Sequence, residues 1–178
     1  ECRGLWIVEK GYKLVGVDAS GLELRMLAHY MNDKDYTNEI INGDIHTSNQ
    51  VAAGLGSRDE AKTFIYAFIY GAGNKKIGTI IGGSERDGER VKEKFLRATP
   101  SLRRLREKVE RVAQRRWVRG LDQRKIIIRH PHAALNTLLQ GAGACVMKKA
   151  LTLLQEYVIN KQIKAFPVVN VHDEFQYE

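Results

Sequence analysis

The most informative segment of the chain begins at Arg58 and has the sequence RDEAKTFIYAFIYG, ending at Gly71. Ser57 and Glu60 just before and inside it form the pattern of a capping box, in which side chains satisfy free backbone groups at a helix start. Glycine is the residue that most often follows a helix, because it tolerates a left-handed backbone. The segment therefore predicts a helix over residues 58–70.

Four side chains recur at every fourth position of this helix and share one slowly drifting face: Arg58, Lys62, Tyr66 and Tyr70. Apolar residues suited to packing cover the other faces: Ala61, Phe64, Ile65 and Phe68. Cations bind phosphates and an aromatic ring stacks on a base, so the polar face suits a nucleoside triphosphate. An ordinary amphipathic helix with surface cations has the same pattern, and the pattern alone favours that interpretation.

Outward from this helix, hydrophobic periodicity predicts a mixture of helices and strands. We expect a hairpin with strands at 6–8 and 14–17, followed by a helix from Leu22. Further helices are expected over about 45–53, 100–112 and 132–158, and a Gly-rich stretch over 78–88. A second hairpin is expected over 117–129, and two strands within 167–177 that turn at residues 172–174. These elements predict an α+β fold.

Composition restricts the class of protein. The chain has 178 residues, of which 43% are hydrophobic and 28% charged, as in soluble globular proteins. No apolar run approaches the length of about 20 residues that spans a bilayer, and no signal peptide is visible. The two cysteines, Cys2 and Cys145, lack the spacing of a zinc site or a disulfide framework, which indicates free thiols. The chain lacks an initial methionine and stops inside a predicted strand at Glu178, so we expect it to be a piece of a longer protein.

Charge points weakly to a polyanionic partner. The net charge is +8, and many cations lie between residues 101 and 129. They are Arg103, Arg104, Arg106, Lys108, Arg111, Arg115, Arg116, Arg119, Arg124, Lys125 and Arg129. A solvated helix face explains such a run as well as nucleic-acid binding does.

Two carboxylates are placed where metal-assisted chemistry needs them. Phosphoryl transfer depends on positioned metals and cations, and magnesium prefers hard oxygen ligands. Asp18 ends one predicted strand and Asp173 lies in the last predicted turn, so both are candidate ligands. Aspartate is also common in turns and caps, and the pattern alone favours that role.

Three ordered segments resemble the signatures of family A (Pol I-type) DNA polymerases. They are Asp18–Arg25 (DASGLELR), Arg58–Gly71 and Val171–Glu174 (VHDE). Gly43–His46 (GDIH) and Asn136–Gln140 (NTLLQ) also match. The sequence of residues 61–66 (AKTFIY) is most similar to that of the replicative enzymes of small lytic bacteriophages. The resemblance covers nearly the whole chain. At each of the positions above it favours the functional interpretation over the ordinary structural one.

The resemblance implies a polymerase palm, an antiparallel sheet with packed helices, joined to helical fingers. Residues 1–32 would form the palm strand that binds metal and the helix after it. Residues 33–115 would form the fingers. Residues 116–178 would complete the palm with a hairpin, a long helix and the second metal-binding hairpin. A thumb and a proofreading exonuclease are not recognised in this chain.

The resemblance also implies roles for individual residues. Asp18 and Asp173 would hold two Mg²⁺ ions, with the Ala19 carbonyl as a further ligand and Glu174 tuning the site. His46, Arg58 and Lys62 would bind the triphosphate, with Lys62 also catalytic as a general acid. Glu23 and Tyr66 would exclude a ribose 2′-hydroxyl, and the tyrosine implies acceptance of dideoxynucleotides. The template and primer would contact Tyr70, Gly71, Arg129, Asn136, Gln140 and His172.

The function implied is template-directed DNA synthesis, with primer-template DNA and deoxynucleoside triphosphates as partners. The expected location is the cytoplasm, that of the bacterial host if a phage encodes the protein, with no membrane partner. A processivity factor is not identifiable. Two alternatives stay open: an enzyme like the single-subunit RNA polymerases, and a non-catalytic nucleic-acid-binding module. The chain by itself is expected to bind primer-template weakly.

Overall fold

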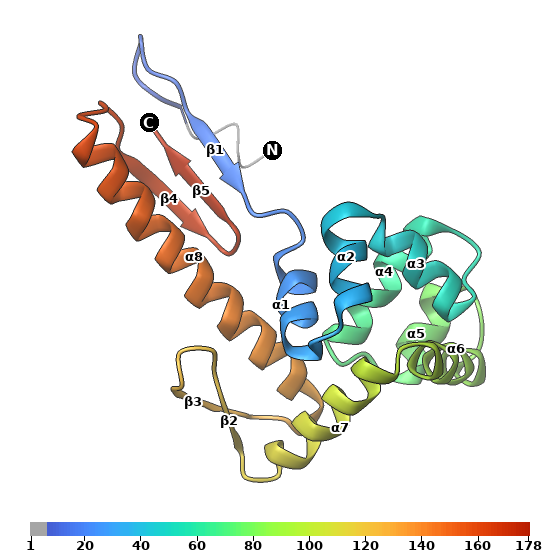
Figure 1. The fold of residues 1–178 in the computed structure, drawn as a ribbon. Coiled ribbons are helices and arrows are strands. Elements are labelled where there is room, and N and C mark those ends of the chain that lie inside the picture. Colours follow the sequence, from blue (N-terminus) through green and yellow to red (C-terminus); the bar gives the residue numbers. More distant parts are fainter. Residues whose placement is uncertain (1–6) are drawn as a thin grey trace. The chain divides into compact units, whose positions relative to one another are not determined.

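The computed structural model describes residues 7–178, which form helices and small antiparallel sheets (Figure 1). The helices are α1 (Leu22–Met31), α2 (Lys34–Asn42), α3 (Ile45–Ala53), α4 (Arg58–Ile69), α5 (Asn74–Ile80), α6 (Glu85–Ala98), α7 (Pro100–Ala113), the 3-10 helix η2 (Pro131–Ala133) and α8 (Ala134–Asn160). The strands are β1 (Val15–Asp18), β2 (Trp117–Arg119), β3 (Lys125–Ile127), β4 (Pro167–Val171) and β5 (Glu174–Tyr177). Within residues 7–178, no helix has both the length and the hydrophobicity needed to cross a bilayer.

The chain divides into two compact units. We call Glu1–Leu22 with Ala142–Glu178 the strand unit, and Glu23–Gly141 the helical unit. Helix α8 begins in the helical unit and continues into the strand unit. The palm and fingers boundaries expected from the resemblance remain a prediction.

The strand unit is built on an antiparallel sheet with the order β1-β5-β4. Strand β1 pairs with β5 from Val15↔Tyr177 to Asp18↔Glu174, and β4 and β5 form a hairpin. Helix α8 runs alongside β4 and β5 (Figure 1), and Tyr177 Oη donates a hydrogen bond to Gln155 Oε1 at 3.3 Å. The alternation of β5 buries Phe175 and Tyr177 and leaves their neighbours half-exposed.

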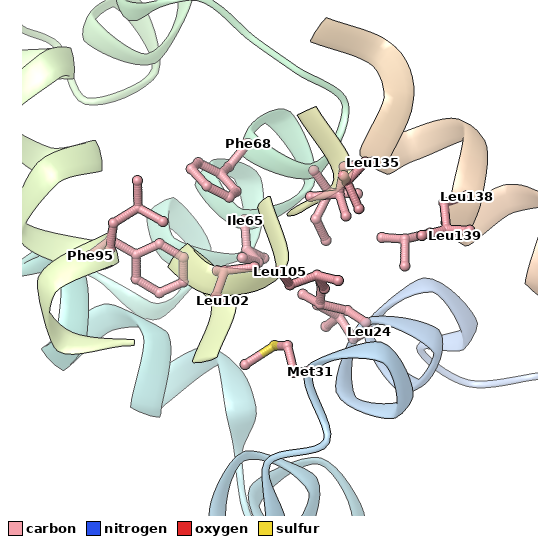
Figure 2. Close-up of a cluster of buried hydrophobic side chains, with 14 of the residues drawn as sticks. Leu24, Met31, Ile65, Phe68, Phe95, Leu102, Leu105, Leu135, Leu138 and Leu139 are labelled. Carbon is pink, nitrogen blue, oxygen red and sulfur yellow. The ribbon is translucent and has the colours of Figure 1, made fainter. Parts of the chain in front are cut away.

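The helical unit contains a continuous hydrophobic core (Figure 2). Helix α4 runs through it, and every apolar residue predicted to pack inward is buried. Its centre includes an aromatic cluster in which the Phe95 ring lies edge-on to Phe64 and Phe68, with centroids 5.2 and 5.6 Å apart. Burying each such side chain contributes about 1.5–3 kcal/mol. The core therefore fixes the orientation of α4 and of the polar face opposite.

The first predicted hairpin is wrong. Strand β1 exists, but Ile7 and Val8 are not in a strand, and Trp6 lies outside the described residues. The partner of β1 is β5, from the far end of the sequence. Local alternation predicted the strand, but pairing is decided by side chains and backbone groups distant in sequence.

The Gly-rich stretch forms helices where the sequence indicated only glycine content. Ser84 and Asp87 make a complete capping box at the start of α6. A Cβ on Gly78 would lie 2.2 Å from the Ser84 carbonyl oxygen, and one on Gly88 would lie 2.1 Å from the Asn74 carbonyl oxygen. These glycines thus allow α5 and α6 to approach closely. The sequence also did not predict α2, although Asp33 caps it by accepting from Tyr36 N.

Candidate functional site

The two aspartates predicted as metal ligands lie at one end of the β1–β5 ladder. Asp18 ends β1 opposite Glu174, and Asp173 lies in the two-residue turn between β4 and β5. The Ala19 N–H donates to the Asp173 carbonyl oxygen at 2.8 Å, which extends the ladder into the turn. Backbone pairing therefore brings together two residues from opposite ends of the chain.

The two aspartates predicted as metal ligands differ in their exposure to solvent. Asp18 is exposed and Asp173 half-buried. Among the described residues, no group of three or more His, Cys, Asp or Glu side chains forms a metal site. Two carboxylates and the Ala19 carbonyl are hard oxygen donors that fit magnesium, which typically combines one or two carboxylates with water and phosphate oxygens.

Glu174 and His172 flank Asp173, one with a bonded side chain and the other with a left-handed backbone. Glu174 Oε1 accepts from Gln176 Nε2 at 2.8 Å, so its carboxylate is engaged along its own strand. His172 has a φ of 51°, in the left-handed region that a tight turn needs. The backbone at His172 thus supplies the reversal that presents Asp173.

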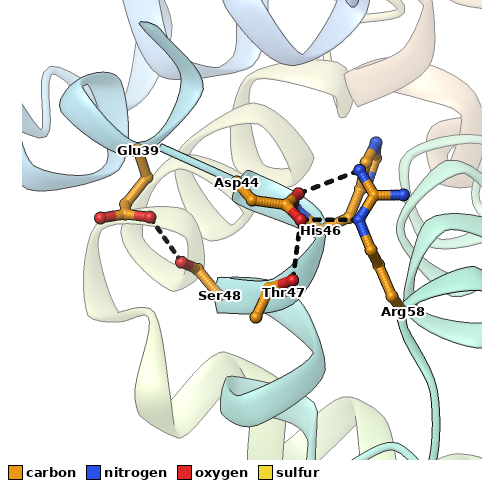
Figure 3. A network of polar contacts seen from close by, with 6 residues as sticks. All are labelled: Glu39, Asp44, His46, Thr47, Ser48 and Arg58. Atoms are coloured by element: carbon orange, nitrogen blue, oxygen red, sulfur yellow. Dashed lines mark hydrogen bonds and ion pairs between the residues drawn. The ribbon is translucent and has the colours of Figure 1, made fainter. Parts of the chain in front are cut away.

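In the helical unit, the start of α4 meets the start of α3 (Figure 3). Asp44 is the N-cap of α3: its carboxylate accepts from His46 N at 3.1 Å and from Thr47 Oγ1 at 2.8 Å. The same carboxylate accepts from Arg58 Nε at 2.6 Å and Arg58 Nη2 at 3.1 Å. The Arg58 hydrogen bond, aided by Thr47, holds the pKa of Asp44 well below its usual range. In return, Asp44 raises the pKa of Arg58.

His46, Lys62 and Tyr66 gather beside Arg58. The rings of His46 and Tyr66 have centroids 6.3 Å apart. Burial lowers the pKa of His46, and the charges of Arg58 and Lys62 lower it further. His46 Nδ1 is buried and has no hydrogen-bond partner within residues 7–178. His46, Arg58, Lys62 and Tyr66, the residues of α3 and α4 predicted to bind the nucleotide, therefore lie in one group.

Glu23 links residues that the sequence predicted for separate tasks. Its Oε1 accepts from Tyr70 Oη at 3.0 Å and from Gln140 Nε2 at 2.9 Å. The predicted partner for Glu23 was Tyr66, so the contact with Tyr70 is an unanticipated one. Because these partners lie 47 and 117 positions from Glu23, no periodicity in the sequence signals them.

Gly71 ends α4 in a conformation that only glycine adopts easily. Its φ is +79°, and a Cβ there would lie 2.5 Å from the His132 carbonyl oxygen. A cavity of about 60 Å³ lies beside it, lined partly by Phe68, Lys92 and Arg106. Lys92 Nζ donates to the Ala72 carbonyl oxygen at 3.2 Å, and burial lowers the pKa of Lys92. The sequence does not distinguish Lys92 from the other helix cations, so its contact with the end of α4 is visible only in the structure.

The remaining predicted template and primer residues lie on several elements. Arg129 is exposed between β3 and η2, and Asn136 is half-buried on α8. Several cations of the basic stretch pair with acids of the chain: Arg103 with Glu93 at 3.2 Å, Arg106 with Glu110 at 2.8 Å, and Arg124 with Asp122. Part of the predicted phosphate-facing charge is therefore neutralised within the protein.

Comparison with known proteins connects this arrangement to one family. The chain is 46% identical over 195 aligned positions to the DNA-directed DNA polymerase of Escherichia phage T7, and 45% identical to that of Enterobacteria phage T3. Each alignment covers 96% of this chain and 28% of the relative, so the chain spans about a quarter of their length. DNA polymerase I of Bacillus subtilis (strain 168) is 26% identical, over 96% of this chain and 22% of that protein.

A solved structure shares the fold. It is the POL domain of Pol1 from M. smegmatis in complex with DNA primer-template and dNTP, with a TM-score of 0.85 and 20% sequence identity. The match covers 97% of this chain and 34% of that chain, and it confirms the predicted α+β fold class. The family model for DNA polymerase family A matches residues 1–178, and the chain therefore belongs to DNA polymerase family A.

Proposed function

We propose that this chain carries the catalytic centre of a template-directed DNA polymerase, which transfers a deoxynucleotidyl group to a primer 3′-hydroxyl. One observation carries the proposal: the Ala19 N–H bonds to the Asp173 carbonyl at 2.8 Å and brings Asp18 and Asp173 to the same ladder end. Membership of a polymerase family gives this pair its chemical meaning. The names of the phage relatives support the same activity.

Two Mg²⁺ ions are proposed to bind at this pair, held by Asp18, Asp173 and the Ala19 carbonyl. When bound, magnesium lowers the pKa of a coordinated hydroxyl and neutralises phosphate charge. The turn at His172 fixes the direction in which Asp173 leaves the hairpin. Glu174, engaged by Gln176 at 2.8 Å, is proposed to tune the charge at the site.

The group around α4 is proposed to bind the incoming deoxynucleoside triphosphate. His46, Arg58 and Lys62 would contact its phosphates, since cationic donors make strong hydrogen bonds to phosphate oxygens. Lys62 would then protonate the leaving pyrophosphate as a general acid. Tyr66 and Glu23 would line the sugar pocket and disfavour a 2′-hydroxyl, and Tyr66 would permit dideoxynucleotides.

Primer-template DNA is the proposed nucleic-acid partner, because the solved POL domain that shares this fold is a complex with DNA primer-template. Tyr70 would stack beside the template base, and Gly71 would let the template approach the backbone. Asn136, Gln140 and His172 would contact the minor groove, whose acceptors are common to all correct pairs. Arg129 would face the phosphate backbone. In this scheme residues 1–32 and 116–178 form the palm, residues 33–115 form the fingers, and the protein acts in the cytoplasm of a bacterial host.

The test is primer extension by the full encoded polypeptide that contains residues 1–178. With magnesium, a labelled primer-template and the four deoxynucleotides, the primer should lengthen in the order the template specifies, and EDTA should stop it. Extension with ribonucleotides at equal efficiency would indicate the RNA polymerase-like alternative. Tight DNA binding without any extension would indicate the non-catalytic module.

A further inference from the structure

The contact between Asp44 and Arg58 has a geometry that orders one edge of the guanidinium (Figure 3). Arg58 uses Nε and Nη2, with distances of 2.6 and 3.1 Å to the two carboxylate oxygens. A guanidinium carries five N–H donors in a rigid planar fork. Two donors are therefore used on Asp44, and both N–H groups of Nη1 and one of Nη2 remain for another acceptor.

Asp44 is itself held in place by hydrogen bonds other than those from Arg58. Its carboxylate caps α3 through His46 N at 3.1 Å and accepts from Thr47 Oγ1 at 2.8 Å, while its carbonyl accepts from Ser48 N at 3.0 Å. The Arg58 side chain, by contrast, is 50% exposed and stands in the first turn of α4. An exposed arginine has high rotamer entropy, so a fixed carboxylate beside it supplies order that Arg58 otherwise lacks.

We propose that Asp44 is a positioning residue for nucleotide binding: it holds the Arg58 guanidinium in one orientation, with its remaining N–H groups ready for a phosphate of the incoming triphosphate. The inference rests on the proposed function, because Arg58 is assigned to the triphosphate there. A preorganised side chain loses less entropy when its ligand binds. Asp44 also begins the helix that carries His46, so one carboxylate fixes both cationic donor and imidazole.

Two other roles for Asp44 make different predictions. As a competitor, Asp44 would occupy Arg58 and hinder the phosphate, so removing its charge would tighten nucleotide binding. As a helix cap alone, Asp44 would affect stability and leave nucleotide affinity unchanged once the cap is preserved. The positioning role predicts weaker nucleotide binding with the cap intact.

The test is Asp44→Asn in the full encoded polypeptide, assayed by rapid-quench incorporation of a single deoxynucleotide on a primer-template. Asparagine caps helices as well as aspartate does, but it offers Arg58 one neutral oxygen. We expect the nucleotide Kd to rise roughly two- to tenfold, the range for ordering one long side chain, while the maximal rate changes less. An unchanged or lower Kd overturns the proposal. Asp44→Ser, another capping residue without charge, gives the same readout if the asparagine variant melts early.

Asp87→Asn is the matched control. Asp87 also accepts at a helix start, from Ser84 N at 2.9 Å, and pairs with an arginine, Arg90, at 2.8 Å. Its substitution changes the net charge by the same amount as Asp44→Asn does. We expect the nucleotide Kd of the Asp87→Asn variant to equal that of the parent protein. An equal rise in Kd would mean that charge or stability acts generally, and would overturn the assignment to Asp44.

A double-mutant cycle shows whether Asp44 acts through Arg58. With Arg58→Ala as background, Asp44→Asn should raise the Kd no further, because the group it positions is gone. A second rise of the same size contradicts the positioning role. If the parent protein incorporates no nucleotide at all, the proposed function fails and takes this inference with it. If the parent extends primers and the cycle is additive, only the inference fails.

Discussion

The strand-end aspartates and the α4 face are organised by different forces. In the strand unit, every residue of β1 is exposed, and the position of Asp18 against Asp173 depends on ladder hydrogen bonds. In the helical unit, Arg58 and Lys62 lie on the face opposite five buried residues of α4: Ala61, Phe64, Ile65, Phe68 and Ile69. One candidate site depends on backbone pairing and the other on side-chain packing.

This difference determines which substitutions each site tolerates. A backbone ladder tolerates many side chains but not the loss of an N–H donor. A packed helix tolerates surface changes but not a cavity beneath it, since cores are close-packed. Substitutions can therefore separate three properties: the chemistry of the aspartates, the alignment of the ladder and the support of the helix.

The largest effect is expected from Asp18→Asn or Asp173→Asn, which should abolish incorporation while the fold and primer-template binding persist. Loss of metal charge stabilisation worth several kcal/mol corresponds to roughly a thousandfold or more in rate. Single-turnover extension and a gel-shift assay measure the two properties. Asp35→Asn, an exposed aspartate on α2, serves as the control. Incorporation within about tenfold of the parent would refute the metal assignment.

Packing under α4 is tested by Phe95→Ala, which removes a fully buried ring from the aromatic cluster. Truncating a buried phenylalanine costs about 3–5 kcal/mol, so urea denaturation followed by circular dichroism should show a large loss. Amide protection in the β4–β5 hairpin should change less than protection in α4. The control is Ile41→Ala, at a site 60% exposed, with an expected change within about 0.5 kcal/mol. Equal losses for the two variants would contradict the comparison.

Alignment of the aspartates is tested by Ala19→Pro. Proline keeps the carbonyl proposed as a ligand but removes the N–H that donates to Asp173 at 2.8 Å. An acceptor left without its donor costs about 1–3 kcal/mol, and extension should fall while the helical unit keeps its stability. Ala19→Ser retains the N–H and should behave as the parent. Equal activity of the two variants would show that the ladder bond does not align the site.

Sequence predicted the elements that carry the sites better than it predicted the contacts between them. Helix α4 begins at Arg58 as expected, because capping and periodicity are local. The Ser57 hydroxyl accepts from Glu60 N at 3.1 Å, as a capping box requires. The Glu60 carboxylate, however, accepts from Gly56 N in place of Ser57 N. The pairing of β1 with β5 and the link from Glu23 to Tyr70 and Gln140 join distant positions. Local pattern holds no information on such pairs.

The glycines show the same limit from the other direction. Gly78 and Gly88 make α5 and α6 difficult to predict from the sequence, since glycine lowers helix propensity. Glycine is needed at both positions because the two helices approach closely. A Cβ on either glycine would lie 2.2 Å or less from a carbonyl oxygen of the neighbouring segment. Gly71 was predicted correctly as the residue after the helix, because that requirement is local.

Gly71→Ala should have a moderate effect, larger than that of its neighbour Gly73→Ala. An alanine at φ +79° is strained, and its Cβ would lie 2.5 Å from the His132 carbonyl oxygen. Such strain costs about 1–3 kcal/mol, measurable as a shift of the urea midpoint. At Gly73 a Cβ meets no atom within 4 Å, and φ is −68°, so alanine should be neutral or slightly stabilising. Similar stabilities for the two variants would contradict the role assigned to Gly71.

The smallest effect concerns the charge of His46. Burial, followed by the charge of Arg58, lowers its pKa in the folded state, so the unfolded chain binds a proton there more readily. Stability should be unaffected above the ordinary histidine pKa of about 6.5 and should fall as pH drops through that value towards the lowered one. His46→Gln should flatten this part of the curve of unfolding free energy against pH. Arg58→Gln should move the His46 pKa upward in an NMR titration, because it removes a neighbouring positive charge. A pKa that stays in place would exclude the Arg58 charge as a cause and weaken the grouping of the two side chains.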